Sequence, residues 1–147
     1  MSTAVHPVGF WARFAAMLVD SLLLVLITVP ILLWAYDTQT LLRPVFVRGP
    51  VDLLVSWVLP VAATLVFWRY RSATPGKMLI GAVIVDAATL GRPSTRQLVI
   101  RYVGYLASIL PLGLGFLWIA WDARKQAFHD KLANTLVVYR PTGARVW

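Results

Sequence analysis

Two long apolar stretches dominate the hydrophobic pattern of the chain. The first runs from about 12 to 36 and the second from about 51 to 69. Each is long enough to cross a bilayer core as a helix, which takes about 20 residues. Asp20 stands well inside the first stretch, where a charge is costly. The pattern therefore predicts two long transmembrane helices joined by a polar connection.

The pattern changes between 70 and 93, where the run "MLIGAVIV" is short, rich in β-branched residues and flanked by turn signals. We expect a small cytoplasmic interfacial segment here that contains a short strand. A second run of this kind, "NTLVVY", lies in the tail at 124–147. The two runs are able to form a short β-pair just outside the membrane.

The third apolar region, at 94–123, begins with Ser94 and Gln97, whose spacing predicts a capping box at the start of a helix. One interpretation is a single crossing over 102–121. The other is a helical hairpin that makes two short crossings or re-enters the same face. Helix-breaking residues at the centre of the region favour the hairpin: Pro111, Gly113 and Gly115.

Positive charge also favours the hairpin. Residues 69–101 carry six Lys or Arg against one Asp, and residues 122–147 carry five against two. Because Lys and Arg gather in cytoplasmic segments, both segments are expected on the cytoplasmic side. A single crossing would separate them, whereas a hairpin keeps them together. The sequence thus predicts an all-α membrane protein, one domain over 1–147, with both termini cytoplasmic.

Composition supports an integral membrane protein, since 59% of the residues are hydrophobic and Glu is absent. The chain has no Cys and two His, so no metal site or cofactor is expected. No set of nucleophile, base and orienting group is visible, so we do not expect an enzyme. The net charge of +8 flanks apolar spans, which indicates lipid headgroups rather than nucleic acid as the partner.

Three separated motifs resemble the RDD family, small bacterial membrane proteins named for an arginine and two aspartates. Arg13 and Asp20 lie in "GFWARFAAMLVD", and Asp130 lies in "AFHDKLANTLVV". The middle motif "TPGKMLIGAVIVD" contributes Thr74, Pro75, Gly76, Lys77 and Gly81. The resemblance covers residues 8–139, with Asn134 where a glycine is expected. It implies a protein of the bacterial inner membrane and a transport activity such as cation/proton exchange.

Arg13 and Asp20 are two helical turns apart, so they share one face at a separation of about 10 Å along the axis. Asp130 is expected to return to this surface and complete an Asp-Arg-Asp cluster. One interpretation is a structural ion pair that specifies packing. The other is that Asp20 or Asp130 exchanges a proton or binds a cation, as intramembrane acids of transporters do.

The remaining basic and aromatic residues are expected at the membrane surface. We interpret four arginines as lipid-headgroup anchors: Arg69, Arg71, Arg96 and Arg101. Most tryptophans, Trp68 among them, fit aromatic belts. So few helices cannot enclose a wide pore, which makes a homo-oligomer or a membrane-protein partner an expectation. Two function classes follow: a small transporter, or a non-transporting scaffold or accessory subunit.

Overall fold

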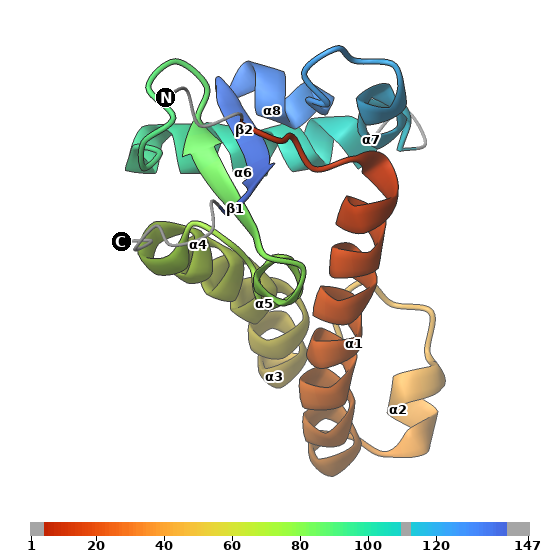
Figure 1. Ribbon diagram of the computed structural model, residues 1–147. Coiled ribbons are helices and arrows are strands. Elements are labelled where there is room, and N and C mark those ends of the chain that lie inside the picture. Colours follow the sequence, from red (N-terminus) through yellow and green to blue (C-terminus); the bar gives the residue numbers. More distant parts are fainter. Residues whose placement is uncertain (1–4, 110–112, 141–147) are drawn as a thin grey trace.

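The computed structural model describes residues 5–109 and 113–140. The chain is mostly helical, with one small sheet (Figure 1). Pro111, the predicted centre of the hairpin, lies outside the described residues. The elements follow in this order: α1 (Phe10–Ala35), α2 (Thr38–Leu42), α3 (Pro50–Asp52), η1 (Leu53–Val58), α4 (Leu59–Arg71), α5 (Pro75–Leu79), β1 (Ala82–Asp86), α6 (Thr95–Ile109), α7 (Leu114–Leu117), η2 (Trp118–Ala120), α8 (Phe128–Leu132) and β2 (Thr135–Tyr139).

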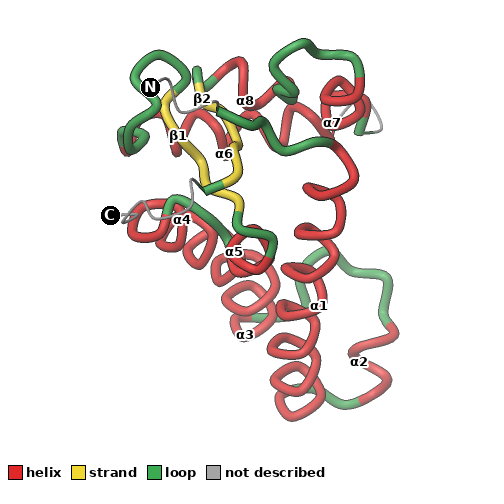
Figure 2. Tube along the Cα trace, viewed as in Figure 1, coloured by secondary structure: helices red, strands yellow, loops and turns green. Residues whose placement is uncertain are grey.

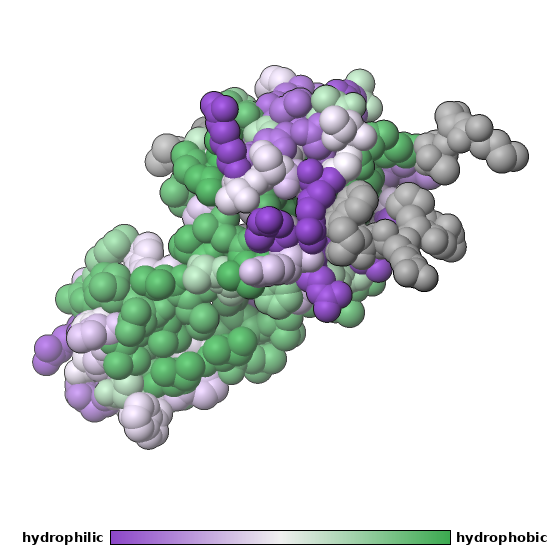
Figure 3. All heavy atoms as spheres, turned by 90° about the vertical axis from the view of Figure 1, so that its left-hand side faces the viewer, coloured by the Kyte–Doolittle hydropathy of each residue, from purple (hydrophilic) through white to green (hydrophobic). Residues whose placement is uncertain are grey.

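Two helical segments are long and apolar enough to cross a membrane. They are Phe10–Ala35 and Pro50–Leu79, and they match the two predicted spans. The second is interrupted at 72–74, between α4 and α5. Few of their residues are buried within the chain, so their apolar side chains cover the surface of this part of the molecule. Figure 3 shows this apolar surface on one part of the molecule, with most hydrophilic side chains gathered at one end and a few at the other. This division is what a bilayer requires.

The second span is not a uniform α-helix, because η1 is a π-helical segment. Leu59 N–H donates to the carbonyl of Leu54, five residues earlier. Pro60 follows, and it has no N–H to donate to the carbonyl of Ser56. A π-turn just before a proline accommodates this missing donor without breaking the helix. The predicted helix at 51–69 is thus present, with a local change in winding.

The predicted β-pair is confirmed. β1 and β2 are antiparallel, with Ala82 opposite Tyr139 and Asp86 opposite Thr135. The N-terminal segment runs along β2, where Val8 N–H donates to the carbonyl of Val137 at 2.9 Å. Trp68, which we expected in an aromatic belt, is instead buried. It belongs to the core beneath the sheet, together with Val8, Ala82, Ile84, Leu98 and Val137.

The sheet, α6 and α8 form a cap across one end of the two spans (Figures 1 and 2). The predicted capping box opens α6: Gln97 N–H donates to Ser94 Oγ at 3.2 Å, and Ser94 N–H donates to Gln97 Oε1 at 2.8 Å. α7 then packs against α6. Gly115 lies so close to Ser108 that a Cβ at Gly115 would be 2.7 Å from Ser108 Oγ.

The detailed hairpin prediction for 94–123 is not confirmed. In Figure 1, α6 runs across the end of α1 rather than alongside it. Among the described residues, neither α6 nor α7 is long and apolar enough to cross a bilayer. One physical reason is that α6 carries the buried Arg101 on the face that packs against α8 and β2.

Candidate functional site

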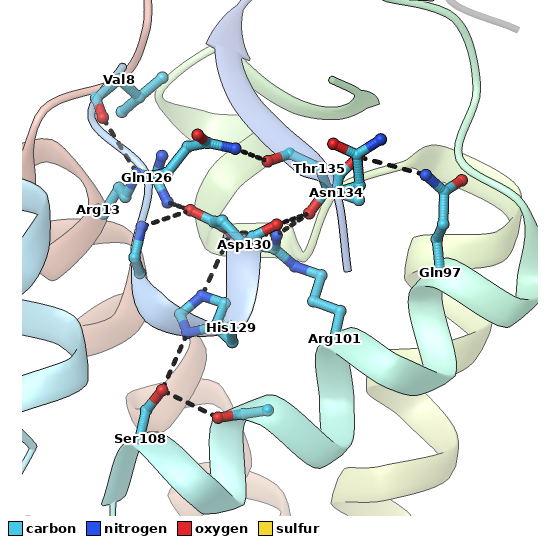
Figure 4. A network of polar contacts seen from close by, with 12 residues as sticks. Val8, Arg13, Gln97, Arg101, Ser108, Gln126, His129, Asp130, Asn134 and Thr135 are labelled. Atoms are coloured by element: carbon cyan, nitrogen blue, oxygen red, sulfur yellow. Dashed lines mark hydrogen bonds and ion pairs between the residues drawn. The ribbon is translucent and has the colours of Figure 1, made fainter. Parts of the chain in front are cut away.

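Asp130 lies fully buried between two arginines (Figure 4). Its Oδ2 accepts a hydrogen bond from Nη1 of Arg13 at 2.5 Å, and its Oδ1 accepts one from Nη1 of Arg101. Ala127 N–H also donates to Oδ2, at 3.0 Å, at the start of α8. We call Arg13, Arg101 and Asp130 the Asp130 cluster. It joins α1, α6 and α8 through one carboxylate.

All three nitrogens of the Arg13 guanidinium donate a hydrogen bond within the chain. Besides its bond to Asp130, its Nε donates to the carbonyl of Val8 at 3.0 Å. Its Nη2 donates to the carbonyl of Lys125 at 2.6 Å. Arg13 therefore ties the first turn of α1 to the N-terminal segment and to the loop that precedes α8. These bonds use three of the five N–H donors of the group.

The interpretation of Arg101 as a lipid-headgroup anchor is wrong, because its side chain is fully buried. Its Nη1 also donates to Thr135 Oγ1 at 2.8 Å, and its guanidinium carbon lies 5.2 Å from the centroid of the Trp68 ring. The spacing of residues along the helix indicates the burial of Arg101. Arg101 shares one face of α6 with Leu98 and Tyr105, whereas Arg96 does not. Three of the four proposed anchors are exposed: Arg69, Arg71 and Arg96.

The electrostatics of the Asp130 cluster favour a fixed charge. Burial acts to raise the pKa of Asp130, but the charges of Arg101 and Arg13 outweigh it and hold this pKa below its ordinary range. His129 beside it behaves differently, because burial lowers its pKa well below the ordinary value. Its ring stacks on that of Tyr105, with 4.0 Å between centroids. Near neutral pH, Asp130 is thus ionised and His129 is neutral.

Asp20 does not join the Asp130 cluster. Its Oδ2 accepts a hydrogen bond from Thr74 Oγ1 at 2.5 Å, and its Oδ1 accepts one from Gly76 N–H at 2.7 Å. The expected bridge from Asp20 through Asp130 to Arg13 is therefore absent. The physical reason is that the start of α5 lies against α1 at this level and supplies closer donors.

This contact explains the middle motif residue by residue. Pro75 occupies the first turn of α5, where a missing N–H costs nothing. Gly76 lies against the carbonyl of Ala16, so a Cβ would overlap the backbone of α1. Gly81 has φ +68° before β1, a conformation that glycine adopts readily. Lys77 is buried.

A cavity of about 490 Å³ separates Asp20 from the Asp130 cluster. Among its lining side chains are Arg13 and Asp20 from α1, Lys77 from α5, Tyr105 from α6 and His129 from α8. Within 5–109 and 113–140, no group of three His, Asp or Glu residues is arranged to hold a metal ion. Most of the other residues that line the cavity are apolar. The arrangement suits binding of a molecule with an apolar part and a polar part.

Comparisons with known proteins find one family model and two relatives that resemble the chain. The family model described as the RDD family matches residues 7–134. An uncharacterized protein of Rickettsia prowazekii (strain Madrid E) is 42% identical over 72 residues, which cover 49% of this chain and 39% of that protein. An uncharacterized protein of Bacillus subtilis (strain 168) is 28% identical over 157 aligned residues, covering 91% of this chain and 98% of that protein. No solved structure matches the chain.

Proposed function

The chain belongs to the RDD family, and from this premise we propose that it is a small transport protein of the bacterial inner membrane that exchanges protons for cations at Asp20. One observation carries the proposal. Asp20 lies in a helix that is long and apolar enough to span a membrane, lines a cavity and makes no ion pair with any residue in the described part of the chain. A charged side chain at the centre of a bilayer costs about 3 kcal/mol, so a carboxylate without a counter-charge in such a helix supports a functional role.

Asp130 is left out of the exchange step. The charges of Arg101 and Arg13 hold the pKa of Asp130 below its ordinary range, so it stays ionised at neutral pH. Its oxygens already accept bonds from both arginines. In this proposal the Asp130 cluster fixes the cap against α1, and Asp20 does the exchange.

The proposal includes a membrane orientation and an assembly. The cap and both termini lie on the cytoplasmic side, where exposed Arg69, Arg71 and Arg96 contact lipid headgroups. Two spans are too few to enclose a path for ions, so the exchanger works as a homo-oligomer. The exposed apolar side chains of α1 and of the second span then contact lipid and the neighbouring copies. No catalytic step or cofactor is part of the proposal.

A second function has its own support. Arg13, Asp20 and Asp130 each bond to a segment distant in sequence, which is how tethers of a fold behave. On this alternative the chain is a non-transporting scaffold or accessory subunit for a membrane-protein partner. It then moves no ions in isolation.

Proton movement in proteoliposomes separates the two functions. An internal pH dye would follow pulses of Na⁺, K⁺ or Li⁺ for the wild type, Asp20→Asn and Asp20→Glu. Asp37→Asn is the matched control, because Asp37 is exposed and asparagine caps a helix as well as aspartate does. We expect cation-dependent flux in the wild type and the control, partial flux in Asp20→Glu and none in Asp20→Asn.

Circular dichroism and monodisperse elution would establish that each variant is folded. A folded wild type without flux contradicts exchange and supports the scaffold. Flux that is unchanged in Asp20→Asn removes Asp20 from the mechanism.

A further inference from the structure

The cavity beside α1 has a largely buried cation, Lys77, in its wall. Lys77 is 8% exposed and lines the cavity. In the described ranges 5–109 and 113–140, no side chain or backbone group accepts a hydrogen bond from its ammonium group, and no carboxylate pairs with it. Burying an ammonium group without a counter-charge is costly. An anion in the cavity would remove this cost.

The nearest carboxylates are already engaged. Asp20 accepts hydrogen bonds from Thr74 and from Gly76, the residue that precedes Lys77. Asp130 is held between Arg13 and Arg101. The cavity and the Asp130 cluster beside it therefore contain three cationic side chains and two carboxylates, while His129 is neutral. One positive charge is therefore in excess over this set of groups.

Tyr105 is a second donor at the wall of the same cavity. Burial acts to raise the pKa of Tyr105, whereas the charges of Lys77 and Arg101 lower it. Tyr105 lines the cavity on the α6 side. An ammonium group and a phenol hydroxyl together suit a carboxylate or phosphate oxygen.

Most of the rest of the cavity wall is apolar, although Arg13 and Asp20 also line it. On α1 the wall is formed by one helical stripe at positions 10, 13, 14, 17 and 20, which includes Phe14 and Met17. Phe14, Met17 and Leu106 line the cavity and are also exposed on the outer surface. In a bilayer these side chains contact acyl chains, so the cavity is accessible to a molecule that comes from the lipid. Its volume of about 490 Å³ lies in the range of small-molecule sites.

We propose that this cavity binds an anionic amphiphile, whose acidic head contacts Lys77 and Tyr105 and whose acyl chain lies along the apolar wall of α1. The site binds the head by charge and the chain by burial of apolar surface. The inference is independent of exchange at Asp20, because it concerns occupancy of the cavity and not ion movement.

This proposal is tested by the binding of amphiphiles to the full chain in dodecyl maltoside. Binding is measured by native mass spectrometry and by the shift in Tm. The probes are palmitate, lysophosphatidylglycerol with the same chain, and uncharged hexadecanol. We expect one acidic amphiphile per chain, with an affinity about 10-fold to 100-fold higher than that of the alcohol, as the charge-assisted bond predicts. The tighter of the two acids identifies a carboxylate or a phosphate head.

Lys77→Met should weaken binding of the acid by a similar factor, and Lys77→Arg should preserve most of it. Arg71→Gln, an exposed cation at the end of α4, is the matched control and should leave binding unchanged. Without ligand, Lys77→Met should melt no lower than the wild type, because it removes an unpaired buried charge. The proposal would be overturned if the alcohol binds as tightly as the acids, or if neither acid binds. It would also be overturned if Arg71→Gln loses as much binding as Lys77→Met, or if ligand-free Lys77→Met has a lower Tm than the wild type.

Discussion

Nη1 of Arg101 donates a hydrogen bond to Oδ1 of Asp130, and both side chains are fully buried. The other carboxylate oxygen of Asp130 accepts a hydrogen bond from Arg13, so one carboxylate bonds to arginines of two helices that are distant in sequence. A buried ion pair adds little stability compared with apolar residues of the same shape. Removing one partner, however, leaves the other charge buried with too little compensation. The cluster therefore specifies how the cap sits on α1.

Arg101→Gln should destabilise the protein by about 3 kcal/mol, because Asp130 and Thr135 each lose a buried donor. Arg96→Gln, five residues earlier on the same helix, removes an exposed charge and should change the free energy of unfolding by less than about 0.5 kcal/mol. Denaturant unfolding in detergent micelles measures both. Similar losses in the two variants would contradict a structural role specific to Arg101.

Gly76→Ala should weaken the contact between α5 and α1. A Cβ at this position overlaps the backbone of Ala16, so the two helices must move apart, and the hydrogen bond from Gly76 N–H to Asp20 lengthens. Overpacking of this kind costs about 1–3 kcal/mol. Gly9→Ala is the control, because no atom lies within 4 Å of its Cβ, and at a helix N-cap it should cost about 1 kcal/mol or less. Thermal unfolding compares the pair, and an equal Tm for the two variants would argue against close packing at Gly76.

His129 should make stability depend on pH. Burial lowers its pKa well below 6.5 in the folded chain, so below about pH 6.5 the unfolded chain binds a proton that the folded chain does not. Stability is therefore full above this pH and falls as the pH decreases, by up to about 1.4 kcal/mol per pH unit. His129→Phe keeps a ring against Tyr105 and should flatten the slope between pH 7 and pH 5.

Unfolding of the two variants His129→Phe and His6→Gln as a function of pH tests this assignment. His6 lies in the exposed N-terminal segment, so its substitution should preserve the slope. If His129→Phe retains the slope of the wild type, another group is responsible for the acid sensitivity.

Several features of the fold could be predicted because they depend on local pattern. The capping box at Ser94 and Gln97 follows from a spacing of three residues. The pairing of β1 with β2 follows from two β-branched runs, each of which is buried on both faces. Arg101 was misassigned because its charge suggested a surface position. The apolar residues on its face of α6 indicated burial, but no local pattern indicates which carboxylate it meets.

The sequence by itself determined the two membrane spans, the cap strands and the family motifs, because hydrophobic length and residue spacing act over a few turns of chain. Only the tertiary structure decided the partners of the signature charges. Arg13 and Asp130 are 117 residues apart, and Asp20 meets Thr74 across 54 residues. Such contacts depend on how helices approach one another in space, which here is set by Gly76 against α1 and by Gly104 of α6 against His129. The cavity with Lys77 at its wall arises from the same approach.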